Sequence, residues 1–314
     1  MACYLVTGGA GFIGSHLADA LLADGHRVRI LDDLSSGRRA NLPAAADFVE
    51  GDVRDPEMIE RLIADAAGVY HLAAIASVER SREAWLATHT VNLTGQVTVL
   101  EAVRRARHGR IPVVYASSAA VYGDNAHLPL SETEPGAPLT AYGADKLGCE
   151  LHARIGAIVH GLATVGLRFF NVYGPRQDPG SPYSGVVSIF CRRLARGEPL
   201  DIYGDGNQER DFIYVGDVVG LLVKAMGAAA AGAEIYNVCT GRGTSVRSLA
   251  QALGAVRGAE PTLRYLPARA GDIARSIGDP RRAQARYGWT AETPLSAGLA
   301  RTFAAIAGDI GVAA

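Results

Sequence analysis

Short apolar runs alternate with longer amphipathic segments through the first half of the chain, and this rhythm constrains the fold more than any other feature. The runs predict buried strands at 4–6, 27–31, 47–50, 69–72, 113–116 and 164–167. The segments between them include helices expected near 12–24, 82–107 and 142–160. Strands that alternate with helices form parallel sheets covered on both faces, so we predict an α/β fold with a Rossmann-type doubly wound parallel sheet.

The rhythm changes after about residue 170, where prolines and glycines predict a loop. A helix near 185–196, a turn at 204–206 and a helix-rich end follow. We therefore expect residues 1–170 to form the Rossmann domain and residues 171–314 to form mainly a smaller second domain. The apolar run 235–238 indicates that the chain returns to the first sheet around 212–240.

Composition excludes several classes of partner. The 31 basic and 32 acidic residues are mixed along the chain, so no strong field would attract nucleic acid or an anionic membrane, and a small molecule is the expected partner. Four widely spaced cysteines indicate reduced thiols rather than a zinc site or a disulfide scaffold. No signal peptide or membrane-spanning run is found, so we expect a cytoplasmic protein without a bound metal.

A glycine-rich turn joins the first predicted strand to the first helix. Gly8, Gly11 and Gly14 lie in TGGAGFIG, in the context that a dinucleotide fingerprint requires. Asp32 ends the second strand about 20 residues further on, where a carboxylate binds ribose hydroxyls and repels a 2′-phosphate. We therefore predict NAD rather than NADP, with Arg38 and Arg39 as the residues that leave this choice open.

Two further predictions concern the nucleotide and the quaternary structure. Asp52, after the third strand, is expected to lie near the adenine amino group, with a solvated loop aspartate as the alternative. The helices expected at 82–107 and 142–160 are long enough to carry a second apolar face, which predicts a homodimer.

A tyrosine and a lysine lie four residues apart in YGADK, hence on one face of one helix. A nearby ammonium favours the phenolate form of a tyrosine, so Tyr142 with Lys146 is a candidate proton-transfer pair. Only Lys146 and Lys224 among the basic residues are lysines, so a lysine at this place suggests a chemical role. Ser118, at the carboxyl end of a predicted strand, is expected to hydrogen-bond the substrate in the same crevice.

The spaced motifs TGGAGFIG, HLAA (71–74), SSAAVYG (117–123), YGADK, RFFNVYGPRQ (168–177) and RDFIYVGD (210–217) resemble the UDP-glucose 4-epimerase-like branch of the extended short-chain dehydrogenase/reductase family. The resemblance extends from the first strand to the last helix. It implies NAD as cofactor, a UDP-sugar as substrate, and 4-epimerisation in which Tyr142 takes the proton of the sugar 4-hydroxyl while hydride passes to NAD and back.

The resemblance also implies the residues that contact each ligand. The expected cofactor contacts are Gly8, Gly11, Phe12, Ile13, Gly14, Asp32, Asp52, Val53, Leu72, Ala73, Ala74, Asn92, Ser117, Tyr142 and Lys146. The expected substrate contacts are Ser118, Asn171, Val186, Tyr203 (on the uracil), Arg210 and Arg269 (on the pyrophosphate), Asp272 (on the ribose) and Ser276.

One departure from the family narrows the reaction, and one position that varies within the family narrows the substrate. Ala119 and Ala120 stand where relatives that dehydrate or decarboxylate usually carry an acid, which argues against a 4,6-dehydratase and less strongly against a uronate decarboxylase. A small Ser276 leaves room for a bulky 2-substituent, so we predict that UDP-N-acetylhexosamines are accepted beside UDP-glucose and UDP-galactose. Other nucleotide-sugar oxidoreductases, a UDP-glucuronate 4-epimerase or decarboxylase, and a non-catalytic NAD-binding sensor remain the alternatives.

Overall fold

The computed structural model describes residues 1–106, 110–180, 185–269 and 271–311. Its main sheet has seven parallel strands in the order β10-β6-β5-β4-β1-β2-β3, which confirms the predicted Rossmann-type fold. The strand order reverses beside β1, where an open α/β sheet forms its ligand crevice. The strands are β1 (Cys3–Thr7), β2 (Arg27–Asp32), β3 (Asp47–Glu50), β4 (Gly68–His71), β5 (Val113–Ser118), β6 (Ala163–Phe169) and β10 (Gly232–Val238).

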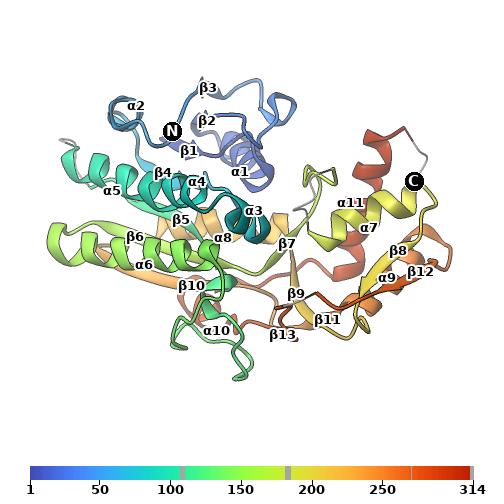
Figure 1. The fold of residues 1–314 in the computed structure, drawn as a ribbon. Helices are drawn as coiled ribbons and strands as arrows, with labels where there is room; N and C mark the ends of the chain where they lie inside the picture. The colour runs from blue at the N-terminus through green and yellow to red at the C-terminus, as the bar shows by residue number, and fades with distance from the viewer. Residues whose placement is uncertain (107–109, 181–184, 270, 312–314) are drawn as a thin grey trace.

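Helices cover both faces of this sheet (Figure 1). Helices α1 and α8 contact each other on one face, and α2, α5 and α6 contact one another on the opposite face. Each face buries its own apolar cluster, because strands covered on both sides are apolar on both sides. These helices are α1 (Phe12–Ala23), α2 (Pro56–Ile63), α5 (Gly95–Arg105), α6 (Ala141–His160) and α8 (Val215–Gly227).

The prediction of a single helix at 82–107 is wrong. The chain instead forms α3 (Val78–Glu83), α4 (Trp85–His89), a π-helical turn η2 (Thr90–Thr94) and α5, and residue 107 lies outside the described residues. The physical reason for the first break is Ala84, whose backbone angles of φ −133° and ψ 60° are not helical. The continuous helix expected at 142–160 is confirmed as α6, which begins after Thr140 because the Thr140 side chain accepts a hydrogen bond from Gly143 N.

The second half of the chain adds a smaller α/β unit beside the carboxyl ends of the main strands (Figure 1). Strands β7, β11 and β13 pair with β9, while β12 pairs with β8. Helices α7, α9 and α11 contact one another over a third apolar cluster. The elements are β7 (Asn171–Tyr173), α7 (Val186–Ala195), β8 (Leu200–Tyr203), β9 (Glu209–Tyr214), β11 (Gly243–Ser245), α9 (Val246–Arg257), β12 (Leu263–Leu266), β13 (Arg275–Ser276) and α11 (Leu295–Asp309). Helix α10 (Arg281–Tyr287) instead packs against β10 and α8.

Three short helical elements complete the described chain, and η3 follows directly on the carboxyl end of β5. None of the described helices is both long and apolar enough to cross a membrane. The short elements are η1 (Arg39–Asn41), η2 and η3 (Ala119–Tyr122).

Candidate active site

The glycine turn after β1 has the geometry of a phosphate-binding loop. Gly8 adopts φ +72°, which favours glycine. A Cβ on Gly14 would stand 2.2 Å from the Gly8 carbonyl oxygen, so helix and turn approach more closely than any side chain allows. Gly11 caps α1 without a side-chain hydrogen bond, which leaves the first N–H groups of the helix available to an anion.

The Asp32 carboxylate lies beside this turn at the end of β2. Its Oδ2 accepts a hydrogen bond from Ala10 N at 3.0 Å, and its Oδ1 accepts one from Leu34 N at 2.9 Å. The side chain is buried, and burial raises its pKa. Because a carboxylate has about four acceptor positions, two remain for the hydroxyls of a ribose. The turn, the helix start and Asp32 together fit the adenosine and pyrophosphate of NAD.

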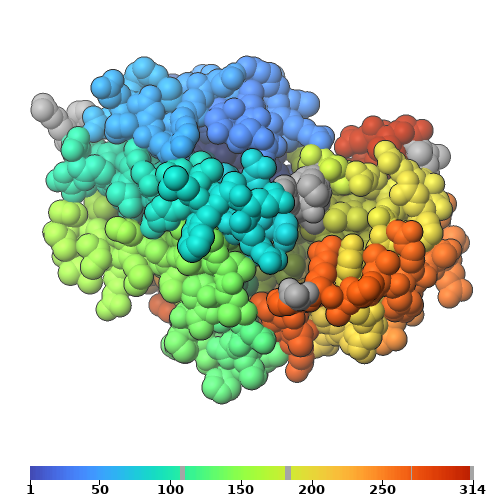
Figure 2. All heavy atoms as spheres, viewed as in Figure 1, coloured from blue at the N-terminus to red at the C-terminus, as the bar shows by residue number. Residues whose placement is uncertain are grey.

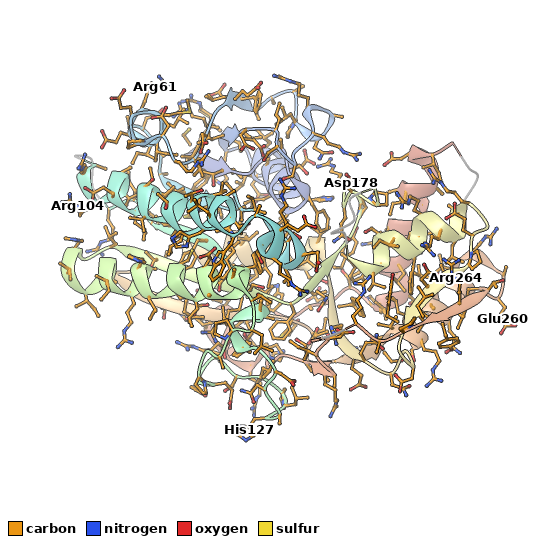
Figure 3. All side chains as sticks on the ribbon, viewed as in Figure 1. Arg61, Arg104, His127, Asp178, Glu260 and Arg264 are labelled. Atoms are coloured by element: carbon orange, nitrogen blue, oxygen red, sulfur yellow. The ribbon has the colours of Figure 1, made fainter. Side chains whose placement is uncertain are left out.

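The two arginines that left the cofactor choice open are both paired with acids. Arg38 lies 2.7 Å from Asp178, a residue that reaches the N-terminal part of the molecule from the loop after β7 (Figure 3). Arg39 pairs with Glu50. Because both arginines have carboxylate partners and the Asp32 carboxylate would repel a 2′-phosphate, the geometry favours NAD over NADP.

Asp52 likewise has a protein partner. Its carboxylate accepts hydrogen bonds from the backbone and side chain of Arg54, and the Arg54 guanidinium lowers the pKa of this aspartate. The expected contact of Asp52 with adenine stays a prediction.

A buried polar network supports the strand ends next to the turn. The Thr7 hydroxyl accepts a hydrogen bond from Ala73 N and lies 2.8 Å from His71 Nδ1. Burial and the charge of Lys146 lower the pKa of His71 to about 3, so this imidazole is neutral. The Asn92 amide binds both the N–H and the carbonyl of Ile75, which holds the segment after β4.

The remaining cofactor contacts stay predictions. Val53 is buried next to η2, whereas Leu72 N donates to the carbonyl of Thr7 on β1. These residues are Phe12, Ile13, Val53, Leu72, Ala73, Ala74 and Asn92.

The three candidate catalytic residues come together between β5 and α6. Tyr142 lies in the first turn of α6, where a helix favours negative charge. The Lys146 ammonium is buried 5.9 Å from the centre of the Tyr142 ring and donates a hydrogen bond to the Ala116 carbonyl at 2.9 Å. The Ser118 hydroxyl oxygen accepts a hydrogen bond from Ala120 N, so its proton stays free for a substrate oxygen.

Five residues expected to contact the substrate form one group in the second half of the chain. The Arg210 guanidinium lies 2.5 Å from Asp272 Oδ1, and Arg269 lies over the Tyr203 ring at 3.9 Å. Ser276 pairs with Arg210 between β13 and β9. The surface is hollowed between the cyan segment around residues 78–90 and the yellow and orange segments of this half (Figure 2). Positive, aromatic and small side chains are thus gathered as a nucleoside diphosphate requires.

The remaining substrate residues and their support lie on adjoining elements. Asn171 begins β7 and pairs with Phe212 of β9, and the half-buried Val186 begins α7. Buried Asp211, next to Arg210, accepts hydrogen bonds from Thr240 and fixes the end of β9 against the turn after β10. The substrate contacts themselves stay predictions.

Sequence reasoning missed one buried ion pair beside the catalytic group. Arg168 on β6 donates two hydrogen bonds to the Glu150 carboxylate on α6. The Ser117 hydroxyl also donates to Glu150, so any cofactor contact by Ser117 would come through its backbone. An arginine inside the apolar run of β6 was the available signal, but its partner lies 18 residues away and needs the fold to be identified.

The chain is similar to one protein family, to curated relatives and to solved structures. Residues 4–239 match the NAD dependent epimerase/dehydratase family. The UDP-glucose 4-epimerase of Mycolicibacterium smegmatis is 42% identical over 305 residues, which cover 95% of this chain and 96% of the relative. A Thermotoga maritima UDP-glucose 4-epimerase solved with UDP-glucose has a TM-score of 0.93 at 38% identity, covering 98% of this chain and 99% of the other.

A second solved structure is similar to the same extent. The UDP-N-acetylglucosamine 4-epimerase of Methanobrevibacter ruminantium, in complex with UDP-N-acetylmuramic acid, has a TM-score of 0.93 at 34% identity. The comparison covers 98% of this chain and 99% of that one.

Proposed function

The chain belongs to the NAD dependent epimerase/dehydratase family, in the UDP-glucose 4-epimerase-like branch of the extended short-chain dehydrogenases/reductases, and from this premise we propose that it interconverts UDP-glucose and UDP-galactose. The observation that carries the proposal is the catalytic group of Ser118, Tyr142 and Lys146 at the carboxyl end of β5.

The side chains of this group suit a reversible proton transfer at the sugar 4-hydroxyl. Tyr142, with the Lys146 ammonium beside its ring, takes the hydroxyl proton and later returns it. Ser118 offers its proton to the same sugar oxygen and stabilises the 4-keto form. The glycine turn, the start of α1 and Asp32 would hold NAD, which would supply the reversible hydride exchange at the sugar carbon. Ala119 and Ala120 supply no further acid, which favours epimerisation over dehydration.

To test the proposal, purified protein is incubated with UDP-glucose without added NAD, and the products are resolved by proton NMR. UDP-galactose should appear in the wild type. Tyr142→Phe should lose at least a hundredfold in turnover, within the ordinary range for general acid-base groups, while it still binds NAD and UDP-glucose. Tyr265→Phe makes the same change on the exposed strand β12 and should turn over normally. Wild-type turnover in Tyr142→Phe would remove Tyr142 from the proton-transfer role. A wild type that stays inactive after NAD is supplied would refute the proposal.

We also propose that the enzyme accepts UDP-N-acetylglucosamine and UDP-N-acetylgalactosamine. Ser276, on β13 opposite Arg210, is small, and one similar structure is a UDP-N-acetylglucosamine 4-epimerase. Ser276→Tyr should lose activity toward the N-acetylated sugars and retain it toward UDP-glucose. Equal loss for both sugars would show that Ser276 does not control the 2-substituent. UDP-glucuronate belongs in the same assay, because its faster conversion would identify a uronate enzyme instead.

The proposed assembly is a homodimer through α6. Leu151, Ile155, Ile158 and Val159 lie on one face of this helix and are each between 54% and 68% exposed. A solvated helix face this apolar is typical of an interface, and packing against the same face of a second copy would cover it. Ile155→Asp should shift the particle from dimer to monomer in light scattering, whereas Ala304→Asp on the exposed side of α11 should not. A monomeric wild type would refute the dimer.

A cytoplasmic location is the last part of the proposal. The four cysteines are all buried free thiols, which suits a reducing compartment.

A further inference from the structure

The buried pair of Glu150 and Arg168 lies directly behind the catalytic group, and the proton-transfer chemistry does not use it. The two side chains are each 7% exposed. Arg168 Nε lies 2.8 Å from Glu150 Oε1, and Arg168 Nη2 lies 2.7 Å from Glu150 Oε2. Burying such a pair costs solvation energy that a well-packed apolar pair would not cost. Its presence beside an active site therefore suggests a role other than stability.

Glu150 connects the catalytic helix to the catalytic strand. It lies four residues after Lys146, on the same face of α6. The Ser117 hydroxyl donates to Glu150 Oε1 at 2.5 Å, while Lys146 Nζ donates to the carbonyl of Ala116. Two consecutive residues of β5 are therefore bonded to two consecutive turns of α6, and Ser118 is the next residue along the strand.

Arg168 also contacts Tyr122, which follows Ser118 by four residues in the chain. Its guanidinium lies 4.7 Å from the centre of the Tyr122 ring, at the end of η3. The Tyr122 hydroxyl donates to Asn237 Oδ1 at 2.6 Å, and burial raises the pKa of Tyr122 to about 12, so the phenol remains a donor. Along the chain, Ser118 therefore lies between two residues, Ser117 and Tyr122, that each contact the Glu150–Arg168 pair.

We propose that Ser117 and the Glu150–Arg168 pair are positioning residues that fix the distance between Ser118 on β5 and Tyr142 on α6. The inference rests on the proposed function, because it assigns a task in that reaction. The three residues act through the catalytic group and do not touch the substrate. A displacement of a reacting group by about 1 Å lowers a rate up to a hundredfold, so one lost anchor at this place should be visible in kcat.

Ser117→Ala is the sharpest test, because it removes the hydrogen bond from Ser117 to Glu150 and leaves Glu150 paired with Arg168. We expect kcat for UDP-glucose to fall about tenfold, as loss of a hydrogen bond to a charged group implies, with KM and bound NAD unchanged. Thr302→Val removes another buried hydroxyl, which donates to Gly298 O within α11, and should lower the melting temperature without changing kcat.

A second variant removes the charges as well. The triple change Ser117→Ala, Glu150→Leu and Arg168→Met leaves no buried charge unpaired, so it should fold. Its kcat should be at least as low as that of Ser117→Ala, again with little change in KM.

Wild-type kcat in Ser117→Ala, or in the folded triple variant, would overturn the inference. So would a loss of kcat in Thr302→Val equal to that in Ser117→Ala, since the effect would then follow stability alone. These outcomes differ from failure of the proposed function, in which the wild type itself does not convert UDP-glucose.

Discussion

Replacing Gly14 by alanine tests whether close backbone approach shapes the cofactor turn. The added Cβ would stand 2.2 Å from Gly8 O and 2.8 Å from Gly9 Cα, and both neighbours are backbone atoms that no rotamer change can move. Overpacking of this kind costs about 1–3 kcal/mol, while the better helix propensity of alanine returns at most about 1 kcal/mol. We expect a net loss of about 1–2 kcal/mol and a distorted phosphate site.

The control changes the same atoms where space is open. A Cβ on Gly227, at the end of α8, would meet no atom within 4 Å. Gly227→Ala should therefore be neutral or stabilised by up to about 1 kcal/mol. Gly11→Ala should be intermediate, since its nearest contact, Gly8 O, lies at 3.1 Å.

Thermal unfolding of protein stripped of bound NAD, with and without NAD added back, measures both effects. One kcal/mol corresponds to about 2–4 °C in proteins of 150–250 residues, so Gly14→Ala should melt several degrees below Gly227→Ala. NAD should raise the melting temperature of the wild type and of Gly227→Ala and leave that of Gly14→Ala unchanged. A Gly14→Ala protein that matches Gly227→Ala in stability and in its response to NAD would refute the steric reasoning.

Two further predictions concern the loop after β7 and the buried imidazole. The Arg38–Asp178 pair joins the loop after β7 to the segment that follows Asp32, so Arg38→Ala should release NAD faster. The increase should be at most about fivefold, because an exposed ion pair contributes at most about 1 kcal/mol. Arg39→Ala loses only its pair with Glu50 and should retain NAD as the wild type does, and stopped-flow displacement compares the two variants. His71 ionises in the unfolded chain near pH 6.5 but in the folded protein only near pH 3, so the unfolded state binds the additional proton and stability falls as pH drops below about 6.5. His71→Asn should flatten this dependence in urea titrations between pH 7.5 and 5, and parallel curves for the two proteins would contradict the assignment.

Most strands of the main sheet were predictable because they contain a short apolar run that ends at a turn signal. The return of the chain to this sheet as β10, beside β6, follows from the same kind of run. The break in the helix at 82–107 was not predictable, because side-chain periodicity does not report backbone angles such as those of Ala84. The π-helical turn that follows places Asn92 against Ile75, a contact between separate segments that local propensity cannot express.

The candidate site likewise contains residues that the sequence predicts and residues that only the fold reveals. Tyr142 and Lys146 were found because four-residue spacing on a helix is a local property, and the glycine turn with Asp32 is confined to one βαβ unit. Ser117, by contrast, shows only a small polar side chain in the sequence. Its partner Glu150 is 33 residues away, and the contact depends on how α6 packs across β5 and β6.

Helix α6 connects the chemistry to the proposed assembly, because it carries different functions on different faces. The buried face binds β5 through Lys146 and Glu150, and the exposed face presents Leu151 and Ile155. Adjacent residues on a helix are separated by about 100°, so Glu150 and Leu151 can serve the strand and a second copy at the same time. A partner packed on the outer face would restrain the helix that places Tyr142, and Ile155→Asp therefore also measures how much of the turnover depends on that restraint.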